Sequence, residues 1–461
     1  MSIIAAFAVP HPPILLPEIG LGKEKEIDKT QYAYLEVMRR VAALRPETIV
    51  IASPHTVMYA DYFHISPGKS AKGDLGQFRA GYVKFNAEYD ADFAEILSRN
   101  ADLEGILAGP LGERDKSLDH GTMVPLYYLN KFYSDYKLVR IGLSGLSQLE
   151  HYKFGQCIAA TAEELGKRVV FIASGDLSHK LKEDGPYGLA PEGSEFDAQI
   201  IEALEKGDFL SILDISPDLA DAAAECGLRS FQIMVGVLDK KAVTHELFSY
   251  EGPFGVGYAV AAFEVIGSDE KRNIGEQFSV LERSRLDKLR SSEDDYVRLA
   301  RLSLETYVKT GKKASLPEGL SNEMLNKRAG TFVSLKKHGQ LRGCIGTISA
   351  TTNSIAEEIM QNAVSAAVSD PRFQQVTEEE LPELVYSVDV LGDAEKIASP
   401  DQLDVKRYGV IVESGGRRGL LLPNLESVDT VLEQISIAKK KAGIGQNEEV
   451  ELFRFEVVRH K

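Results

Sequence analysis

Four histidines in the first half of this sequence are the side chains best suited to chemistry, because of the residues around them. His11 follows Phe-Ala-Val-Pro, His55 follows Ile-Val-Ile-Ala-Ser-Pro, and His179 follows Val-Val-Phe-Ile-Ala-Ser-Gly-Asp-Leu-Ser. His120 lies between an aspartate and a glycine in Leu-Asp-His-Gly-Thr-Met-Val-Pro-Leu. A neutral imidazole is a common metal ligand and also accepts protons near neutral pH. We therefore predict that the histidines after the apolar runs converge on one metal ion.

Two histidines do not complete a metal site, so a third ligand is needed. The candidates are Cys226, Glu225 and Glu251. Two histidines and a carboxylate form the usual site for non-haem Fe(II), whereas a thiolate favours a softer metal such as zinc or copper, or retunes iron. The residues alone leave this choice open, because Cys226 is equally well interpreted as a small buried hydrophobe.

Asp176 and His179 are candidates for acid–base work, because a spacing of three residues brings them together on one turn. Asp176 would orient His179, which would take a proton from a substrate hydroxyl, with His120 as the partner acid. Alternatively, the Ser-Gly-Asp run only caps a helix. The five remaining histidines lack such surroundings and are interpreted as structural or solvated; they are His64, His151, His245, His338 and His460.

Buried strands are the elements that would position these histidines. Apolar, β-branched runs that stop at loops with Pro or Gly predict strands over 3–9, 49–53 and 169–173. Apolar residues at helical spacing over 29–44 make the first two strands part of a βαβ unit, in which strands run parallel. Ligands bind at the carboxyl edge of such a sheet. We therefore expect an α/β domain with a mostly parallel central sheet flanked by helices.

Length and composition indicate two domains. A chain of 461 residues exceeds what one hydrophobic core usually supports, and it becomes highly charged after residue 267. We predict a metal-binding domain over 1–267, a charged linker over 268–290 and a second domain over 291–461. Strands and helices do not alternate steadily in the second half, which predicts a smaller α+β domain.

The charge and the cysteines narrow the class of partner and the compartment. A net charge of −16 argues against nucleic acid or an anionic membrane as partner and leaves a small-molecule substrate open. Three cysteines do not make a disulfide framework, and no apolar stretch is long enough to span a bilayer. We therefore expect a cytoplasmic protein, and a homo-oligomer is left open.

The histidine motifs resemble those of two related families. His11-Pro-Pro, Ser-Pro-His55, Leu-Asp-His120-Gly-Thr and Ser-Gly-Asp-Leu-Ser-His179 are similar to motifs of the LigB-type class III extradiol dioxygenases and of the Memo family, over about residues 1–266. The dioxygenase resemblance implies Fe(II) held by His11, His55 and a glutamate, with His120 and His179 acting on protons and on a catechol-like substrate or O₂. Glu-Cys226-Gly is more similar to the Memo family, which implies that Cys226 completes the metal site.

The second half resembles the AMMECR family. Its signature is matched by Leu-Arg342-Gly-Cys344-Ile-Gly-Thr, and Ser-Asp-Pro-Arg-Phe over 369–373 and Gly-Arg-Arg-Gly-Leu-Leu-Leu-Pro over 416–423 also fit. In this motif the glycines would let backbone N–H groups approach a ligand, Arg342 would clamp an anion and Cys344 would be a nucleophile. A tight strand turn with a buried cysteine is the other interpretation.

Two functions follow from these resemblances. The first is a metal-dependent oxidoreductase with Fe(II) at His11, His55 and Cys226, His179 as base, and His120 as acid or O₂-facing group. The second is a metal-binding accessory or modification protein without ring-cleaving activity. The fusion of the two families resembles two parts of the AmmeMemoRadiSam system, which implies a separate radical SAM protein as partner.

Overall fold

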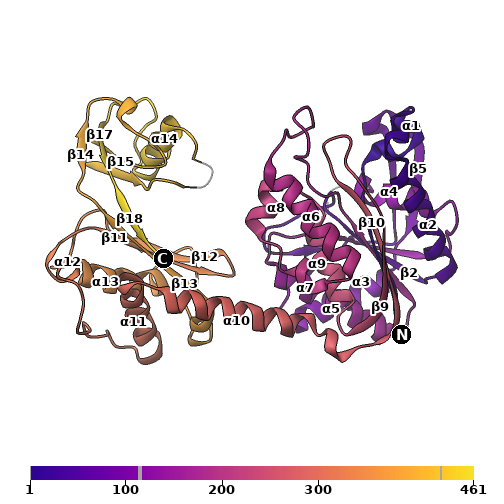
Figure 1. The fold of residues 1–461 in the computed structure, drawn as a ribbon, viewed down its shortest axis with the longest axis horizontal. Helices are drawn as coiled ribbons and strands as arrows, with labels where there is room; N and C mark the ends of the chain where they lie inside the picture. Colours follow the sequence, from indigo (N-terminus) through magenta and orange to yellow (C-terminus); the bar gives the residue numbers. More distant parts are fainter. Residues whose placement is uncertain (1, 113–116, 426–427) are drawn as a thin grey trace. The chain divides into compact units, whose positions relative to one another are not determined.

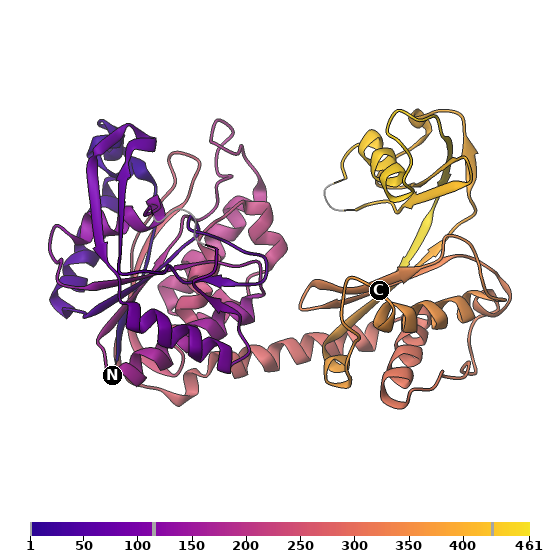
Figure 2. The ribbon, with the colours of Figure 1, turned by 180° about the vertical axis from the view of Figure 1, so that it is seen from behind.

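The chain forms two units, residues 1–281 and 282–461, each with its own hydrophobic cores. The computed structural model describes residues 2–112, 117–425 and 428–461, and Figures 1 and 2 show it from opposite sides. No helix in this described part of the chain is long and apolar enough to cross a membrane. Each unit is described below by itself.

A six-stranded sheet organises the N-terminal unit. Its strands are, in spatial order, β7 (Lys137–Gly142), β2 (Thr48–Ser53), β8 (Val169–Ser174), β1 (Ile3–Val9), β10 (Tyr258–Ser268) and β9 (Lys241–Glu251). The first four strands pair in parallel, and β10 and β9 are added antiparallel at one edge. The predicted mostly parallel central sheet is therefore confirmed.

Helices cover both faces of this sheet, because neighbouring residues of each central strand are apolar and point to opposite sides. Phe7 packs with one buried cluster, and Ala6 and Ala8 pack with the other. The helices on the Phe7 side are α1 (Pro17–Gly20), α2 (Asp28–Leu44) and α4 (His120–Leu129). On the other side are α3 (Ala91–Leu103), α5 (Gln148–Leu165), α6 (Pro191–Lys206), α7 (Phe209–Leu213), α8 (Pro217–Ala223) and α9 (Leu228–Val237).

The carboxyl ends of three parallel strands meet at one edge of the sheet. β8 lies between β1 and β2, and in this register Val9 pairs with Ser174 while Ala52 pairs with Ala173. The loops that leave β1, β2 and β8 therefore begin side by side. They carry His11, His55 and Asp176 to one place, as the parallel arrangement predicts.

The C-terminal unit is a smaller α+β domain, as predicted. One antiparallel sheet has the order β12 (Gln340–Gly346), β11 (Thr331–Lys337), β13 (Leu384–Leu391) and β18 (Val457–His460). A second antiparallel sheet has the order β14 (Glu395–Ile397), β17 (Glu451–Phe455), β15 (Gly409–Ser414) and β16 (Arg417–Leu421). The helices are α11 (Asp295–Thr310), α12 (Asn322–Asn326), α13 (Ile355–Val368) and α14 (Val431–Lys441).

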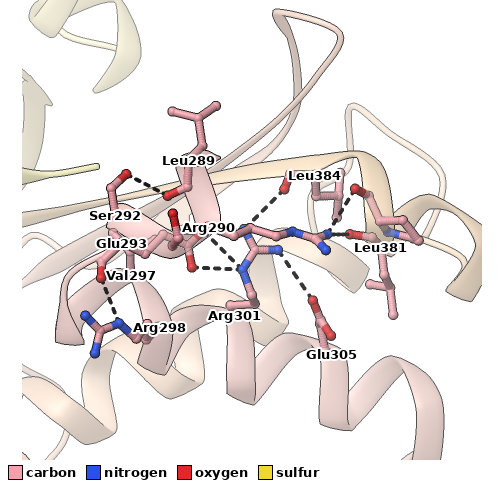
Figure 3. A network of polar contacts seen from close by, with 12 residues as sticks. Leu289, Arg290, Ser292, Glu293, Val297, Arg298, Arg301, Glu305, Leu381 and Leu384 are labelled. Carbon is pink, nitrogen blue, oxygen red and sulfur yellow. Dashed lines mark hydrogen bonds and ion pairs between the residues drawn. The ribbon is translucent and has the colours of Figure 1, made fainter. Parts of the chain in front are cut away.

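The charged segment after residue 267 is largely helical. Most of it forms α10 (Ile274–Ser292), and within the C-terminal unit its last turns are held by a polar network (Figure 3). Arg290 donates to the carbonyl of Leu381 at 3.0 Å, and Nε of Arg301 donates to both carboxylate oxygens of the buried Glu293 at 3.1 and 3.0 Å. These bonds fix where α10 ends and α11 begins.

One strand and one helix junction of the N-terminal unit bear on the site. β9 was not predicted, because most residues of Lys241–Glu251 are polar or only half-buried, as suits an edge strand. The helices α8 and α9 are separated at Ala224, which has a left-handed φ of 53°. The interruption contains Cys226, so it creates the loop that carries the thiol.

Candidate metal centre

His11 lies just beyond β1 and is buried with both ring nitrogens engaged. Its Nδ1 lies 3.0 Å from Oγ of Ser174, and that hydroxyl lies 2.6 Å from the carbonyl oxygen of Gly121. A hydroxyl has one hydrogen to donate, and the carbonyl can only accept. Nδ1 of His11 therefore carries the hydrogen donated to Ser174, and Nε2 presents a lone pair, which is the form of imidazole that binds metals.

Three ligand atoms meet in front of this lone pair. Nε2 of His11 lies 2.9 Å from Nε2 of His55 and 3.7 Å from Sγ of Cys226, and the three atoms all lie within 4.8 Å of one another. Without an ion, the two nitrogens can approach so closely only by sharing a proton. With an ion, both lone pairs and the thiolate would serve as donors, a set that suits zinc, iron or copper.

A contact between two glycines places Cys226 at this point. Gly175 follows β8, Gly227 follows the cysteine, and a Cβ on Gly175 would lie 2.1 Å from the Cα of Gly227. A side chain at Gly175 would separate the two loops, and a Cβ on Gly227 would crowd the carbonyl oxygen of Asp176 at 3.0 Å. The close approach lets the backbone N–H of Asp176 donate to Sγ of Cys226 at 3.3 Å.

The two glutamates that competed with Cys226 as third ligand lie outside the cluster. Oε2 of Glu225 accepts from the backbone N–H of Leu228 at 2.6 Å, at the start of α9. Oε2 of Glu251 accepts from the N–H and the hydroxyl of Thr30, both at 2.8 Å, at the start of α2. Each carboxylate thus binds a helix N-terminus, where negative charge is favoured, and Cys226 is the candidate that joins the histidines.

His120 lies beside the cluster at the first residue of α4. Its ring stacks on His55 with centroids 3.9 Å apart and rings inclined by 29°. Gly121 makes room for this arrangement, because a Cβ there would lie 2.4 Å from Oγ of Ser53, the last residue of β2. Burial, and after it the charges of His55 and His11, lower the pKa of His120 to about 3, so the ring is neutral at neutral pH.

Asp119 supplies a buried negative charge that sequence reasoning missed. It accepts from the hydroxyls of Ser53 at 2.5 Å and Thr122 at 3.0 Å, and lies 3.4 Å from the guanidinium of the buried Arg140. Burial raises the pKa of Asp119, but Arg140 and these hydroxyls outweigh it and hold the pKa below its usual value. The position of Asp119 directly before His120 could have marked it as a site residue. Its ion pair with Arg140 on β7 could not be inferred from the sequence.

Asp176 and His179 lie near the cluster but are arranged differently from the expectation. Asp176 accepts from the backbone N–H of His11 at 2.8 Å, so it fixes the His11 loop. Among the described residues, Asp176 does not pair with Nδ1 of His179. Burial raises the pKa of Asp176 to about 6 and lowers the pKa of His179. Nδ1 of His179 is buried and has no hydrogen-bond partner in the described part of the chain. A bound molecule could supply that partner.

In the C-terminal unit, three residues of the Leu-Arg-Gly-Cys-Ile-Gly-Thr motif contact neighbouring parts of the fold. Arg342 is not a free anion clamp, because its Nε and Nη2 donate to the two carboxylate oxygens of Glu380 at 2.9 Å each. A Cβ on Gly343 would lie 2.2 Å from the carbonyl oxygen of Ala366 on α13, and one on Gly346 would clash with a phenylalanine ring at 2.2 Å. Both glycines therefore make room for neighbouring groups of the fold, in place of the ligand that was expected there.

Two family models match this chain, one over most of each unit. Residues 5–261 match the family model described as the catalytic LigB subunit of aromatic ring-opening dioxygenase, and residues 297–460 match AMMECR1. Protein CA_C1420 of Clostridium acetobutylicum is 43% identical with full coverage of both chains. A Thermotoga maritima protein is 48% identical over 37% of this chain and 98% of its own length.

Among solved structures, the uncharacterized protein PH0010 from Pyrococcus horikoshii is 34% identical over 36% of this chain and 88% of that chain, with a TM-score of 0.34. The LigB match spans more than half of the chain, and it contains every residue of the His-His-Cys cluster. The chain therefore belongs to the family of the catalytic LigB subunit of aromatic ring-opening dioxygenases, and it carries an AMMECR1 domain in its second half.

Proposed function

We propose that the N-terminal unit is a metal-dependent oxidoreductase of the ring-opening dioxygenase type, in which His11, His55 and Cys226 hold Fe(II). The observation that carries this proposal is the convergence of three ligand atoms within 4.8 Å at the carboxyl edge of the sheet. A thiolate contributes one negative charge, as the carboxylate of the common Fe(II) site does. When bound, the metal would chelate two adjacent oxygens of a small catechol-like substrate and activate O₂ beside them.

The neighbouring side chains are suited to moving protons around such a substrate. A diol must lose protons to chelate, and His179 is proposed as the base, because its buried Nδ1 has no partner among the described residues. His120, whose neutral ring stacks on His55, is proposed as the O₂-facing group, or as an acid that passes on a proton it has first received from the substrate. Asp176 holds the backbone of His11 and so fixes the direction of its Nε2.

Metal binding and turnover test this proposal separately. Protein loaded with Fe(II) under anaerobic conditions is expected to hold about one ion per chain, and His11→Ala with His55→Ala is expected to abolish binding. His245→Ala is the matched control, because His245 is an exposed histidine on β9. Loaded protein is then mixed with air-saturated catechols, and O₂ uptake with a yellow ring-opened product is expected. Intact binding in the double variant would overturn the assigned site.

A second candidate function is favoured by the donor set itself. A sulfur in place of the third carboxylate is compatible with a protein that binds a metal and assists a separate radical SAM enzyme, without opening rings of its own. Stoichiometric metal binding with no O₂ uptake on any catechol would favour this candidate. Co-purification of a radical SAM protein with the tagged chain, lost in the double histidine variant, would support it further.

A further inference from the structure

Cys344 lies in the AMMECR1 signature, and its surroundings differ from those of the buried Cys157. It is half-buried on β12, and its sulfur accepts a hydrogen bond from the hydroxyl of Ser334 on β11 at 3.2 Å. Its backbone N–H donates to Oδ2 of Asp370 at 2.9 Å. Two sequence motifs, the signature and Ser-Asp-Pro-Arg-Phe, therefore meet at the thiol.

Arg372 is fixed beside the cysteine with part of its guanidinium unused. Its Nε and Nη2 donate to the carboxylate of Asp370 at 2.9 and 2.6 Å, and Nη2 also donates to the carbonyl of Cys344 at 3.1 Å. Nη1 has no hydrogen-bond partner among the described residues, and the side chain is 52% exposed. The guanidinium is thus held in one orientation while one nitrogen remains open to a ligand.

Two further cations interact electrostatically with Cys344. Lys441, at the end of α14, has a pKa that is lowered by burial and by Arg372 and raised by Cys344. The pKa of Arg459 on β18 is raised mainly by its pairing with Asp389 at 2.7 Å, and to a smaller extent by Cys344. Asp370 balances Arg372 in the same way, so the cluster has one positive charge more than its carboxylates balance. Lys441 carries that charge, because it makes no ion pair or hydrogen bond within the part of the chain that the structure describes.

We propose that Cys344, Arg372 and Lys441 form a second site, independent of the metal centre, that binds a small carboxylate- or phosphate-bearing ligand beside a reactive thiol. Reactive cysteines lie in electropositive, partly exposed surroundings, whereas structural cysteines are buried and inert. The anion clamp expected at Arg342 is thereby assigned to Arg372 and Lys441. Cys157 of the same chain is a structural cysteine by this criterion, because it is buried and burial raises its pKa to about 11.

The site is tested by alkylating the full-length protein with two reagents that differ in charge. Iodoacetate and iodoacetamide react alike, since the sulfur attacks the methylene carbon and iodide leaves, but iodoacetate carries a carboxylate. Peptide mass spectrometry follows Cys344 separately from the other cysteines. Relative to glutathione, Cys344 is expected to favour iodoacetate about threefold or more, and added salt is expected to reduce this preference.

Three variants decide which residues make the preference. Arg372→Gln and Lys441→Gln are each expected to return the ratio of rates towards that of glutathione. Lys440→Gln, at the neighbouring and equally exposed position, is expected to leave the ratio unchanged. Lys441→Gln alone decides the test if Arg372→Gln does not fold, because the Lys441 side chain makes no hydrogen bond or ion pair with any described residue. A glutathione-like ratio in the unmodified protein, or an unchanged ratio in Lys441→Gln, would overturn the site.

Competition identifies the ligand chemistry. Inorganic phosphate and acetate are each added during alkylation by the neutral iodoacetamide. Slower reaction of Cys344 with phosphate alone assigns a phosphate-bearing ligand, and slower reaction with both assigns a general anion site. If neither anion slows alkylation at moderate salt, the anion-binding part of the proposal is wrong.

Discussion

The hydroxyl of Ser174 lies between Nδ1 of His11 and the carbonyl of Gly121, and this position decides which nitrogen of His11 carries a hydrogen. Ser174 is the last residue of β8, the strand between β1 and β2. The central strand therefore orients a proposed metal ligand that is carried by the loop of its neighbour. This relationship would make metal binding sensitive to a residue that is not itself a proposed ligand.

Ser174→Ala is expected to weaken metal binding about 10- to 100-fold while leaving the fold intact, because partners that orient a histidine ligand typically contribute that much. Competition with a chromophoric chelator measures the affinity. Ser230→Ala is the matched control, since Ser230 is equally buried and donates to the carbonyl of Ser174 without touching His11. Equal affinities for the two variants would contradict the orienting role.

Cys226→Ser is expected to remove sulfur from the metal centre. Protein loaded with Co(II) should show a thiolate-to-cobalt charge-transfer band in the near ultraviolet, and this band should be absent in the variant. Cys344→Ser should retain it, because Cys344 is not part of the His-His-Cys cluster. A band of full intensity in Cys226→Ser would show that another atom completes the site.

Gly175→Ala is expected to lower the free energy of unfolding by about 3 kcal/mol, because the new methyl group has no space against Gly227. The variant should also lose metal affinity, since the same contact places Cys226. Gly267→Ala is the control, because its nearest atom would be an ordinary 3.9 Å away. Urea denaturation and metal titration measure the two effects independently.

Asp90 is expected to make stability depend on pH. It accepts from Lys167 at 2.7 and 2.8 Å and from the hydroxyl of Thr48 at 2.6 Å. Burial raises the pKa of Asp90, but these bonds outweigh it and hold the pKa below the value of the unfolded chain. Its contribution to stability is therefore present above about pH 4 and is lost as the pH falls through the folded-state pKa.

Asp90→Asn should accordingly cost about 2 kcal/mol at pH 7 and progressively less below pH 4. Asp92→Asn should have little effect at either pH, because Asp92 is exposed in the first turn of the same helix. A cost for Asp90→Asn that stays constant from pH 7 to pH 3 would contradict the assigned direction of the pKa shift. Urea denaturation at several pH values makes the comparison.

The strands behind His11 and His55 could be predicted, because an apolar run ended by proline leaves few alternatives for a short buried segment. Residue types alone did not separate the candidates for the third ligand, since Cys226, Glu225 and Glu251 have equally suitable chemistry, and only the resemblance to the Memo family favoured Cys226. Their separation depends on one left-handed residue in the interrupted helix and on a threonine of α2 that lies 221 positions before Glu251. Such contacts are set by tertiary packing and leave no periodic signal.

The charged groups were the least predictable part of both units. Arg342 was expected to bind a ligand, but its guanidinium donates to the carboxylate of Glu380. Asp119 was passed over, although Arg140 makes it a stable buried anion. In each case the partner comes from another element, so the sequence shows the residue type but not whether its charge is already balanced.

The order in which the metal-binding side chains emerge during synthesis follows from their separation along the chain. His11 and His55 leave the ribosome long before Cys226, and the thiol takes its place only after β8 has docked between β1 and β2 and the two glycine loops have closed together. A nascent chain would therefore offer an incoming metal ion only two of the three proposed ligands. Metal binding by all three would be a late event that follows assembly of the sheet.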